Sequence, residues 1–313
     1  MTPQGIAALC DWALLVPCLY GTFDRPPRTV FVHHFMLQHF INLILPYIPK
    51  VFEFVLVSSG TDLTIPTSMG DIRFTPLRGF SNNSLDEGGP HWQLLTSHPQ
   101  IMHWYCENHD LTHPRVSTLP TGIVRNIKGM DPLEHSGQPS PMKSRPLRFL
   151  VAHRLRSMRG QWELRKNVSV ACLRMQLTHD LCMYPRRPVS MDNRKGINKE
   201  LYIKLIISVP FVLCVHGGGL DPSPKAWEAI MLGTIPIIQH STLDDAYEQL
   251  PVVFVRSWDD LFESEVHSLR ERLREVLTAL SPFYDDPARR AVVIAVSGVS
   301  IGSTIAARSN SSC

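Results

Sequence analysis

Glycines at positions 217–219 follow an apolar run that ends at Val215. Glycine lets the backbone approach a ligand closely, and a helix that begins beside such a loop attracts phosphate at its N-terminus. A short helical pattern follows, with Ser223 at the N-cap position and Pro224 at the first helical position. A second apolar run begins at Ile235. This order of strand, glycine loop, helix and strand predicts a βαβ unit that holds a phosphorylated ligand.

The helix of this unit presents two different faces. Its large apolar residues recur at i, i+3 and i+4 and predict a buried face, made by Trp227, Ile230 and Met231. Lys225 and Glu228 are three residues apart on another face. Lys225 would meet an anion bound at the start of the helix, although a solvated Lys–Glu pair after a plain glycine turn is an equally good interpretation. Gly233 stands where a C′ residue would end the helix.

A second group of basic residues follows an apolar run over 147–152. Arginine presents a fork of donors that suits phosphate oxygens, so the group could clamp a diphosphate across the crevice from the glycine loop. A solvated loop and helix face is the alternative. The group consists of His153, Arg154, Arg156, Arg159, Arg165 and Lys166.

The segment 103–113 allows two interpretations. Its spacing HxxCxxHxxxH could be drawn as a zinc site of His103, Cys106, His109 and His113. Its other residues suit the wall of a sugar or base pocket, and we favour this role or ordinary half-buried histidines. The expected pocket residues are Trp104, Tyr105, Asn108 and Asp110.

Alternating strand-like and helix-like runs must position these groups. In the first half, strands are expected over 29–32 and 51–57 with a helix over 34–48 between them. The loop 58–62 then leaves the carboxyl end of a strand, where ligands collect in open α/β sheets. Residues 70–100 read as loop-rich. After a Gly, Pro and Ser-rich stretch the alternation restarts, with strands over 147–152, 211–215, 235–238 and 252–255 and helices over 165–176, 202–208, 243–249 and 258–280.

This pattern predicts an α/β protein with two halves joined by a hinge-like connection. The expected organisation is an N-terminal domain over 1–127, a linker over 128–146, a C-terminal domain with the glycine loop over 147–285 and a tail over 286–313. The 313 residues include 44% hydrophobic and 19% charged residues, which is enough for packed cores. The formal net charge of +3 gives no reason to expect a nucleic-acid partner.

Compartment signals are weak. Seven scattered cysteines do not require a disulfide framework, and we expect Cys172 and Cys182 to be free thiols although they could bridge in a lumenal protein. The apolar start of the chain is interrupted by Asp11 and is not a convincing signal peptide. The uncharged stretch 291–307 is short for a membrane span, so membrane attachment stays open.

Two passages resemble the exostosin-like glycosyltransferases. The first reads GGGLDPSPKAWEAIMLGTIPII and continues with STLDDAYEQLPVVFV and the Trp-Asp pair at 258–259. It is similar to the family's succession of G-x-G-x-D, a basic residue, (W/L)-E-A-L, G-x-I-P-(I/V), L-P-V and Trp-Asp. The second, HPQIMHWYCENHDLTHPRVSTLPTGI, resembles the family's W-Y-x-x-N-x-D, H-P-(K/R) and L-P-x-G passage. Ribitol xylosyltransferase-type proteins are similar in style.

The resemblance implies a GT-B architecture, in which two Rossmann-like domains face each other across a cleft. It implies a nucleotide-sugar donor held by the C-terminal domain, a glycan or glycoprotein acceptor, no required cofactor or catalytic metal, and residence in the Golgi or secretory lumen. Lys225 stands where the family commonly has arginine, and Glu228 would bind the ribose or sugar hydroxyls. The other implied donor residues are His216, Gly217, Gly218, Gly219, Asp221, Ser223, Arg159 and Arg165.

The general base is the least specified role. Activation of an acceptor hydroxyl needs a carboxylate or imidazole within hydrogen-bond reach. We expect Asp62, at the end of a strand in the first half, with Asp110 and His91 as alternatives. A noncatalytic nucleotide- or glycan-binding protein with the same cleft is the alternative function, because the chain has Lys225 in place of arginine and an unrecognisable C-terminal end.

Overall fold

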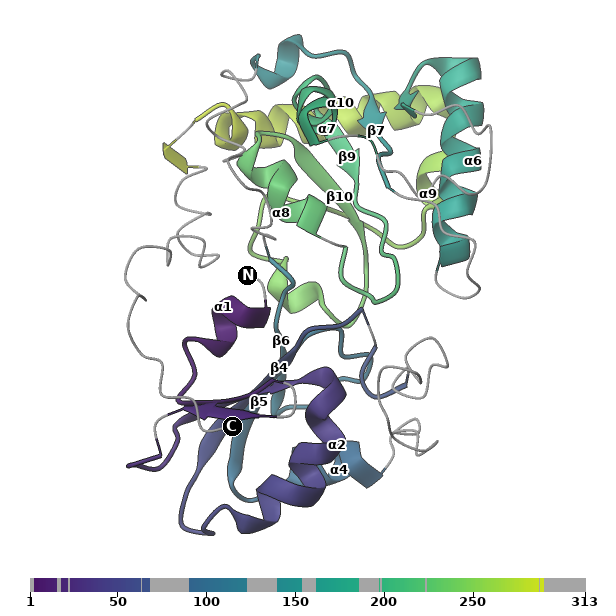
Figure 1. Cartoon of the computed structure of the whole chain (residues 1–313). Helices are drawn as coiled ribbons and strands as arrows, with labels where there is room; N and C mark the ends of the chain where they lie inside the picture. Colours follow the sequence, from purple (N-terminus) through teal and green to yellow (C-terminus); the bar gives the residue numbers. More distant parts are fainter. Residues whose placement is uncertain are drawn as a thin grey trace.

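The computed structural model describes residues 3–15, 18–21, 23–62, 64–67, 90–122, 140–153, 162–185, 197, 199–222, 224–286 and 288–289. Two open sheets lie one beyond the other, each with helices packed on it (Figure 1). The first sheet comes from the N-terminal half of the chain and the second from the C-terminal half. Both are mainly parallel, which confirms the predicted α/β class.

The first sheet has the strand order β2-β1-β3-β4-β5-β6. All neighbouring strands are parallel except β1 and β2, which form an antiparallel pair. The strands are β1 (Trp12–Leu14), β2 (Leu19–Gly21), β3 (Thr29–His33), β4 (Phe54–Ser59), β5 (Ile101–Cys106) and β6 (Val116–Thr118). Their helices include α1 (Pro3–Ala7), α4 (Pro90–Ser97) and a helical run made of η1 (His34–Met36), α2 (Leu37–His39), η2 (Phe40–Ile44) and η3 (Leu45–Tyr47).

The second sheet has the order β11-β10-β9-β7-β8 and is entirely parallel. Its strands are β7 (Phe149–Leu150), β8 (Cys182–Met183), β9 (Phe211–Leu213), β10 (Ile235–Gln239) and β11 (Val253–Val255). Its helices include η6 (Met142–Ser144), α6 (Trp162–His179), α7 (Lys199–Ile207), α8 (Pro224–Met231), η7 (Asp244–Ala246), α9 (Asp259–Phe262) and α10 (Val266–Tyr284).

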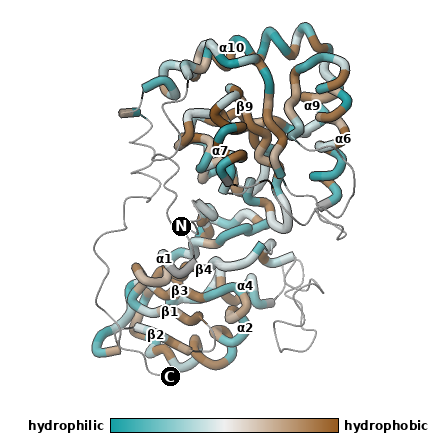
Figure 2. Tube along the Cα trace, turned by 45° about the horizontal axis from the view of Figure 1, so that its top comes forward, coloured by the Kyte–Doolittle hydropathy of each residue, from teal (hydrophilic) through white to brown (hydrophobic). Residues whose placement is uncertain are grey.

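The apolar runs form strands because helices cover them on both faces. All three residues of β9 are fully buried, as expected for a central parallel strand. Figure 2 shows β9 almost wholly hydrophobic, whereas α10 alternates between hydrophobic and hydrophilic positions. Leu269, Leu273 and Leu277 give α10 its buried stripe. Each half therefore has its own hydrophobic core.

Several boundaries differ from the predictions. The expected loop-rich stretch contains α4 over its last part, and the motif at 103–106 belongs to β5, a strand between β4 and β6. The helix expected over 243–249 is only the short η7, and the long helix expected over 258–280 is divided into α9 and α10. The second helix is divided just before Glu265, whose side chain accepts hydrogen bonds from the amides of His267 and Ser268 at the start of α10.

The last residues of the predicted linker are packed on the second half. The Arg145 guanidinium is buried and donates to the carbonyl oxygens of Gly233 at 2.7 Å and Val209 at 3.2 Å. Met142 is fully buried, and its amide donates to Asp285 at 2.9 Å. Residues 123–139 of this stretch lie outside the described residues. The proposed domain limits stay predictions.

The cysteines also differ from expectation. Cys172 on α6 and Cys182 on β8 form a disulfide with their Cα atoms 5.5 Å apart, so they are not the two free thiols that we expected. The helix α6 turns directly into β8, which brings the two side chains together. Among the described residues, no helix is both long and apolar enough to cross a bilayer.

Candidate functional site

The second sheet has a switch point between β7 and β9. The chain passes from β7 to β8 on one side and then to β9 on the other, so the connections leave the sheet in opposite directions. In open parallel sheets, ligands bind outside the carboxyl ends of the strands at such a point. His153 follows β7 there, and the glycine loop at 216–219 follows β9. The predicted phosphate-binding loop therefore lies at the position that the topology favours for a ligand.

Arg165 fixes the start of this loop. Its Nε donates to the carbonyl oxygens of Val215 at 3.2 Å and His216 at 2.9 Å, and its Nη2 donates to Val215 at 3.1 Å. The side chain is buried. Arg165, which was predicted to clamp a diphosphate, thus uses these donors to tie α6 to the end of β9. The guanidinium charge stays at the crevice.

Among the described residues of the crevice, Arg165 and Lys225 carry the positive charge that acts on the two neighbouring histidines. Burial, followed by the charges of Arg165 and Lys225, holds the pKa of His153 well below its usual range. Burial and the nearby Arg165 lower the pKa of His216 to about 4. Both imidazoles are therefore neutral at pH 7, and Arg165 and Lys225 supply the charge. The influence of Lys225 on His153 shows that the first turn of α8 lies near the end of β7.

Glu228 is a buried residue of α8 rather than part of a solvated pair. It is 8% exposed. Burial and then the charge of Glu228 raise the pKa of the Tyr202 hydroxyl well above its usual range. This influence shows that Tyr202 of α7 lies beside Glu228. Gly233 has φ 73°, as predicted for the residue that ends α8. Ser223, the expected N-cap, and Arg159 lie outside the described residues.

The carboxyl edge of the first sheet contains a buried carboxylate that the sequence analysis missed. Glu107 directly follows β5 and accepts hydrogen bonds from the amide of Gly60 at 2.8 Å and the hydroxyl of Thr121 at 2.8 Å. Burial raises its pKa to about 7 despite these two donors, with a further upward contribution from Asp221. A charged residue placed immediately after an apolar strand was the available signal, but the strand itself was not recognised.

The carboxyl edges of the two sheets meet through hydrogen bonds between distant segments. The amide of Thr121 donates to Asp221 at 3.1 Å, and the amide of Thr118 donates to Asp245 at 3.1 Å. The Asn108 side-chain oxygen accepts from the amides of Leu220 at 3.0 Å and Asp221 at 2.8 Å. Tyr247 also donates to Asp221, at 3.1 Å. The loop after β9 therefore faces the loops after β5 and β6.

The expected acceptor-side residues are dispersed. Trp104 is 1% exposed, donates to Ser58 and packs on Trp92, so it belongs to the core of the first half rather than to an open pocket. Tyr105 is 41% exposed and packs on His103. Asn108 is buried at the meeting of the two halves.

The three candidate bases occupy different settings. Asp62 is exposed in the loop after β4. Asp110 is half-buried and accepts a hydrogen bond from the amide of Thr67 at 3.4 Å. His91 lies half-buried in the first turn of α4. Among the described residues, none of the three makes a hydrogen bond to the glycine loop.

The four residues that could have formed a zinc site have separate surroundings. His103 pairs with Ser117 at 2.9 Å, and His109 pairs with Thr118 at 3.0 Å. Cys106 is fully buried, whereas His113 accepts from the amide of Arg115 at 3.1 Å. Within the described ranges, no three or more His, Cys, Asp or Glu side chains group as metal ligands.

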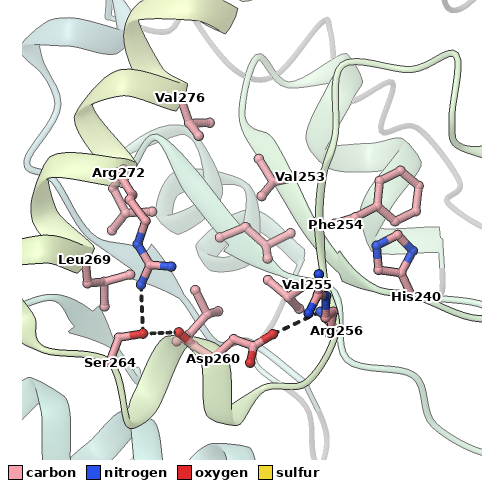
Figure 3. A pocket seen from close by; sticks show the side chains of 13 residues that line it. His240, Val253, Phe254, Val255, Arg256, Asp260, Ser264, Leu269, Arg272 and Val276 are labelled. Atoms are coloured by element: carbon pink, nitrogen blue, oxygen red, sulfur yellow. Dashed lines mark hydrogen bonds between the residues drawn. The ribbon is translucent and has the colours of Figure 1, made fainter.

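A groove with a volume of about 490 Å³ lies elsewhere on the second half (Figure 3). Its floor comes from β10 and β11 and its wall from α9 and α10. Arg272 donates to Ser264 at 2.7 Å along one side. No residue predicted for donor or acceptor binding lines it. The candidate site is therefore the meeting of the two carboxyl edges and not this groove.

The chain was compared with known families, curated proteins and solved structures. No family model matches the chain, and no curated protein matches it. Among solved structures, spinosyn rhamnosyltransferase SpnG aligns with 12% identity and a TM-score of 0.37, over 88% of this chain and 70% of that chain. Its complex with thymidine diphosphate aligns with 13% identity and a TM-score of 0.32, over 87% and 69%.

A kitacinnamycin glycotransferase aligns with 11% identity and a TM-score of 0.33, over 88% of this chain and 77% of that chain. These solved structures are glycosyltransferases. Their TM-scores are too low for the likeness to bear on the function of this chain. The functional argument therefore rests on the geometry of the site.

Proposed function

We propose that the chain is a glycosyltransferase, of exostosin-like type and GT-B arrangement, which transfers a sugar from a nucleotide-sugar donor to a hydroxyl of a glycan or glycoprotein. One observation carries this proposal. The switch point of the second sheet combines a glycine loop with the cations Arg165 and Lys225, and this loop faces the carboxyl edge of the first sheet. A donor held on one edge would then meet an acceptor bound at the other.

The donor side requires charge compensation. A departing nucleoside diphosphate gains negative charge, and fixed cations and amides stabilise it in a site that excludes water. In the proposal, Lys225 neutralises this charge with Arg159 and Arg165, and Glu228 binds hydroxyls of the ribose or sugar. The loop from His216 through Gly217, Gly218 and Gly219 to Asp221 and Ser223 supplies the surrounding backbone. No cofactor or metal is part of this scheme.

The acceptor side remains the less specified part of the proposal. Asp62 is the proposed base, with Asp110 and His91 as alternatives, and Tyr105 and Asn108 contribute to the surrounding wall. The Cys172–Cys182 disulfide supports residence in an oxidising compartment such as the secretory lumen.

Two substitutions test the donor site. We expect Lys225→Ala and Glu228→Ala each to weaken the binding of UDP or GDP, measured by calorimetry, by about tenfold or more, since each removes a charge-assisted contact. Lys225→Arg keeps the cation and should retain binding. Tyr202→Phe removes the hydroxyl beside Glu228 without removing the carboxylate, and should also retain it.

The donor assignment would be wrong if both alanine variants bound the nucleoside diphosphates as the wild type does. Circular dichroism of each variant must match that of the wild type, because Glu228 is buried.

A noncatalytic nucleotide- or glycan-binding protein is the second candidate. The exposed position of Asp62, with no side-chain hydrogen bond to another described residue, favours it because a general base must be held in place. A hydrolysis assay with a panel of UDP- and GDP-sugars separates the two functions. Hydrolysis above a heat-inactivated control supports the transferase, and binding without any turnover supports the noncatalytic protein.

A further inference from the structure

The side chain of Asn108, from the first half, is held between loops of both halves. Its Nδ2 donates to the carbonyl oxygen of Thr61 at 3.2 Å in its own half. Its Oδ1 accepts from the amides of Leu220 at 3.0 Å and Asp221 at 2.8 Å in the other half. One amide side chain therefore links the loop after β4 to the end of the glycine loop.

The backbone of Asn108 is specialised for this position. Its φ is 57°, in the left-handed region that most residues avoid and asparagine tolerates. Its carbonyl oxygen accepts from the amide of Ile65 at 2.9 Å, and the residue is 3% exposed. A residue held in a strained conformation by surrounding contacts commonly marks a functional position. The backbone of Asn108 therefore holds its side chain in the position from which it contacts the glycine loop.

Gly219 fits this side chain closely. A Cβ atom on Gly219 would lie 2.5 Å from Oδ1, 2.6 Å from Cγ and 2.8 Å from Nδ2 of Asn108. These distances are too short for any real contact. Gly219, the third glycine, thus allows Asn108 to approach closely. Any side chain at position 219 would displace the side-chain amide of Asn108.

We propose that Asn108 is a positioning residue that sets the conformation of the glycine loop from the facing half of the molecule. Two consecutive amides of the loop turn toward one oxygen, and this orientation fixes the path of the chain between β9 and α8. The loop is correctly shaped only when the two halves are together. The link from this contact to nucleoside diphosphate affinity rests on the proposed function, whereas the contact itself does not.

Hydrogen exchange tests the contact directly. We expect Asn108→Ala to speed exchange of the Leu220 and Asp221 amides by about tenfold, since their shared acceptor is lost. Asn108→Asp keeps an acceptor oxygen and should restore slow exchange at both amides. The matched control Asn167→Ala, at an exposed position of α6, should leave both unchanged. Unchanged exchange in Asn108→Ala would overturn the proposal, provided that the amides of β9 remain protected.

A suppressor experiment uses the fit at Gly219. Gly219→Ala should speed exchange at the same two amides, because its methyl group displaces the Asn108 side chain. Adding Asn108→Ala removes the clash, so the double variant should exchange no faster than Asn108→Ala alone. Additive effects of the two substitutions would contradict the proposed fit.

UDP and GDP affinities then test the coupling to the site. We expect Asn108→Ala to weaken binding about tenfold and Asn108→Asp to restore most of it. Wild-type affinity in Asn108→Ala would overturn the coupling. If the wild type binds neither nucleotide, the proposed function has failed, and the exchange measurements still decide the role of Asn108.

Discussion

One buried residue at the meeting of the two halves makes the stability of the molecule depend on pH. Glu107 is a buried acid with a pKa raised to about 7 from an ordinary value of 4.5. Between these values the folded protein holds a proton that the unfolded chain has released. The free energy of unfolding therefore falls as the pH rises from about 4.5 through about 7, and the contribution of this group is complete below pH 4.5.

Glu107→Gln should remove this pH dependence. The glutamine can accept from the Gly60 amide and donate to the Thr121 hydroxyl, so it imitates the protonated acid. Relative to this variant, the wild type should lose up to about 3 kcal/mol of stability between pH 4.5 and 7. Urea denaturation across this range measures the difference. The exposed Glu53→Gln is the control, and parallel curves for wild type and Glu107→Gln would contradict the prediction.

Residues of this kind were only partly predictable from the sequence. Lys225 and Glu228 lie on one short helix that ends just before Gly233; its spacing and ends are local signals, and this helix was placed correctly. The roles of Glu107 and Asp245 were not predicted, because their partners lie in other loops and because β5, the strand directly before Glu107, was not recognised. The bond between Thr118 and Asp245 joins residues 127 positions apart.

At the scale of elements, strands within continuous apolar runs were recognised even when short, as for β7 and β11, whereas the six-residue β5 was not. The runs that became β3, β9 and β10 are continuous and buried. The strand β5 was missed because its partly exposed His103 and Tyr105 interrupt the apolar pattern, and β8 lies in no continuous apolar run. Whether such segments form strands depends more on their tertiary pairing than on their own composition.

The disulfide between α6 and β8 gives a prediction at this scale. Cys172 and Cys182 close a short loop with a sequence separation of 10 residues. Replacing both with alanine should lower the free energy of unfolding by about 2–3 kcal/mol, because the unfolded chain gains freedom. Cys106→Ala is the control, since it removes a buried sulfur that forms no disulfide. Equal losses in denaturant unfolding for the control and the double variant would show that the bond itself contributes nothing.

At the scale of the whole molecule, a few hydrogen bonds hold the two halves together. Asp245 accepts from both the amide and the hydroxyl of Thr118. Asp245→Ala should therefore speed exchange of the Thr118 amide and increase the radius of gyration in solution scattering. The exposed Glu248→Ala, on the following turn, should change neither quantity. A variant with the wild-type radius and exchange rate would show that this bond does not contribute to closure.

The same bond has a consequence for solubility. β6 is the outermost strand of the first sheet, and the Thr118 amide points away from β5 toward Asp245. Unpaired strand edges recruit other chains into intermolecular sheets, and charged side chains that cover such an edge prevent this. Closure of the two halves therefore also shields a potential nucleus of aggregation. A ligand that holds the halves together would lengthen the life of the protein in solution as well as prepare it for turnover.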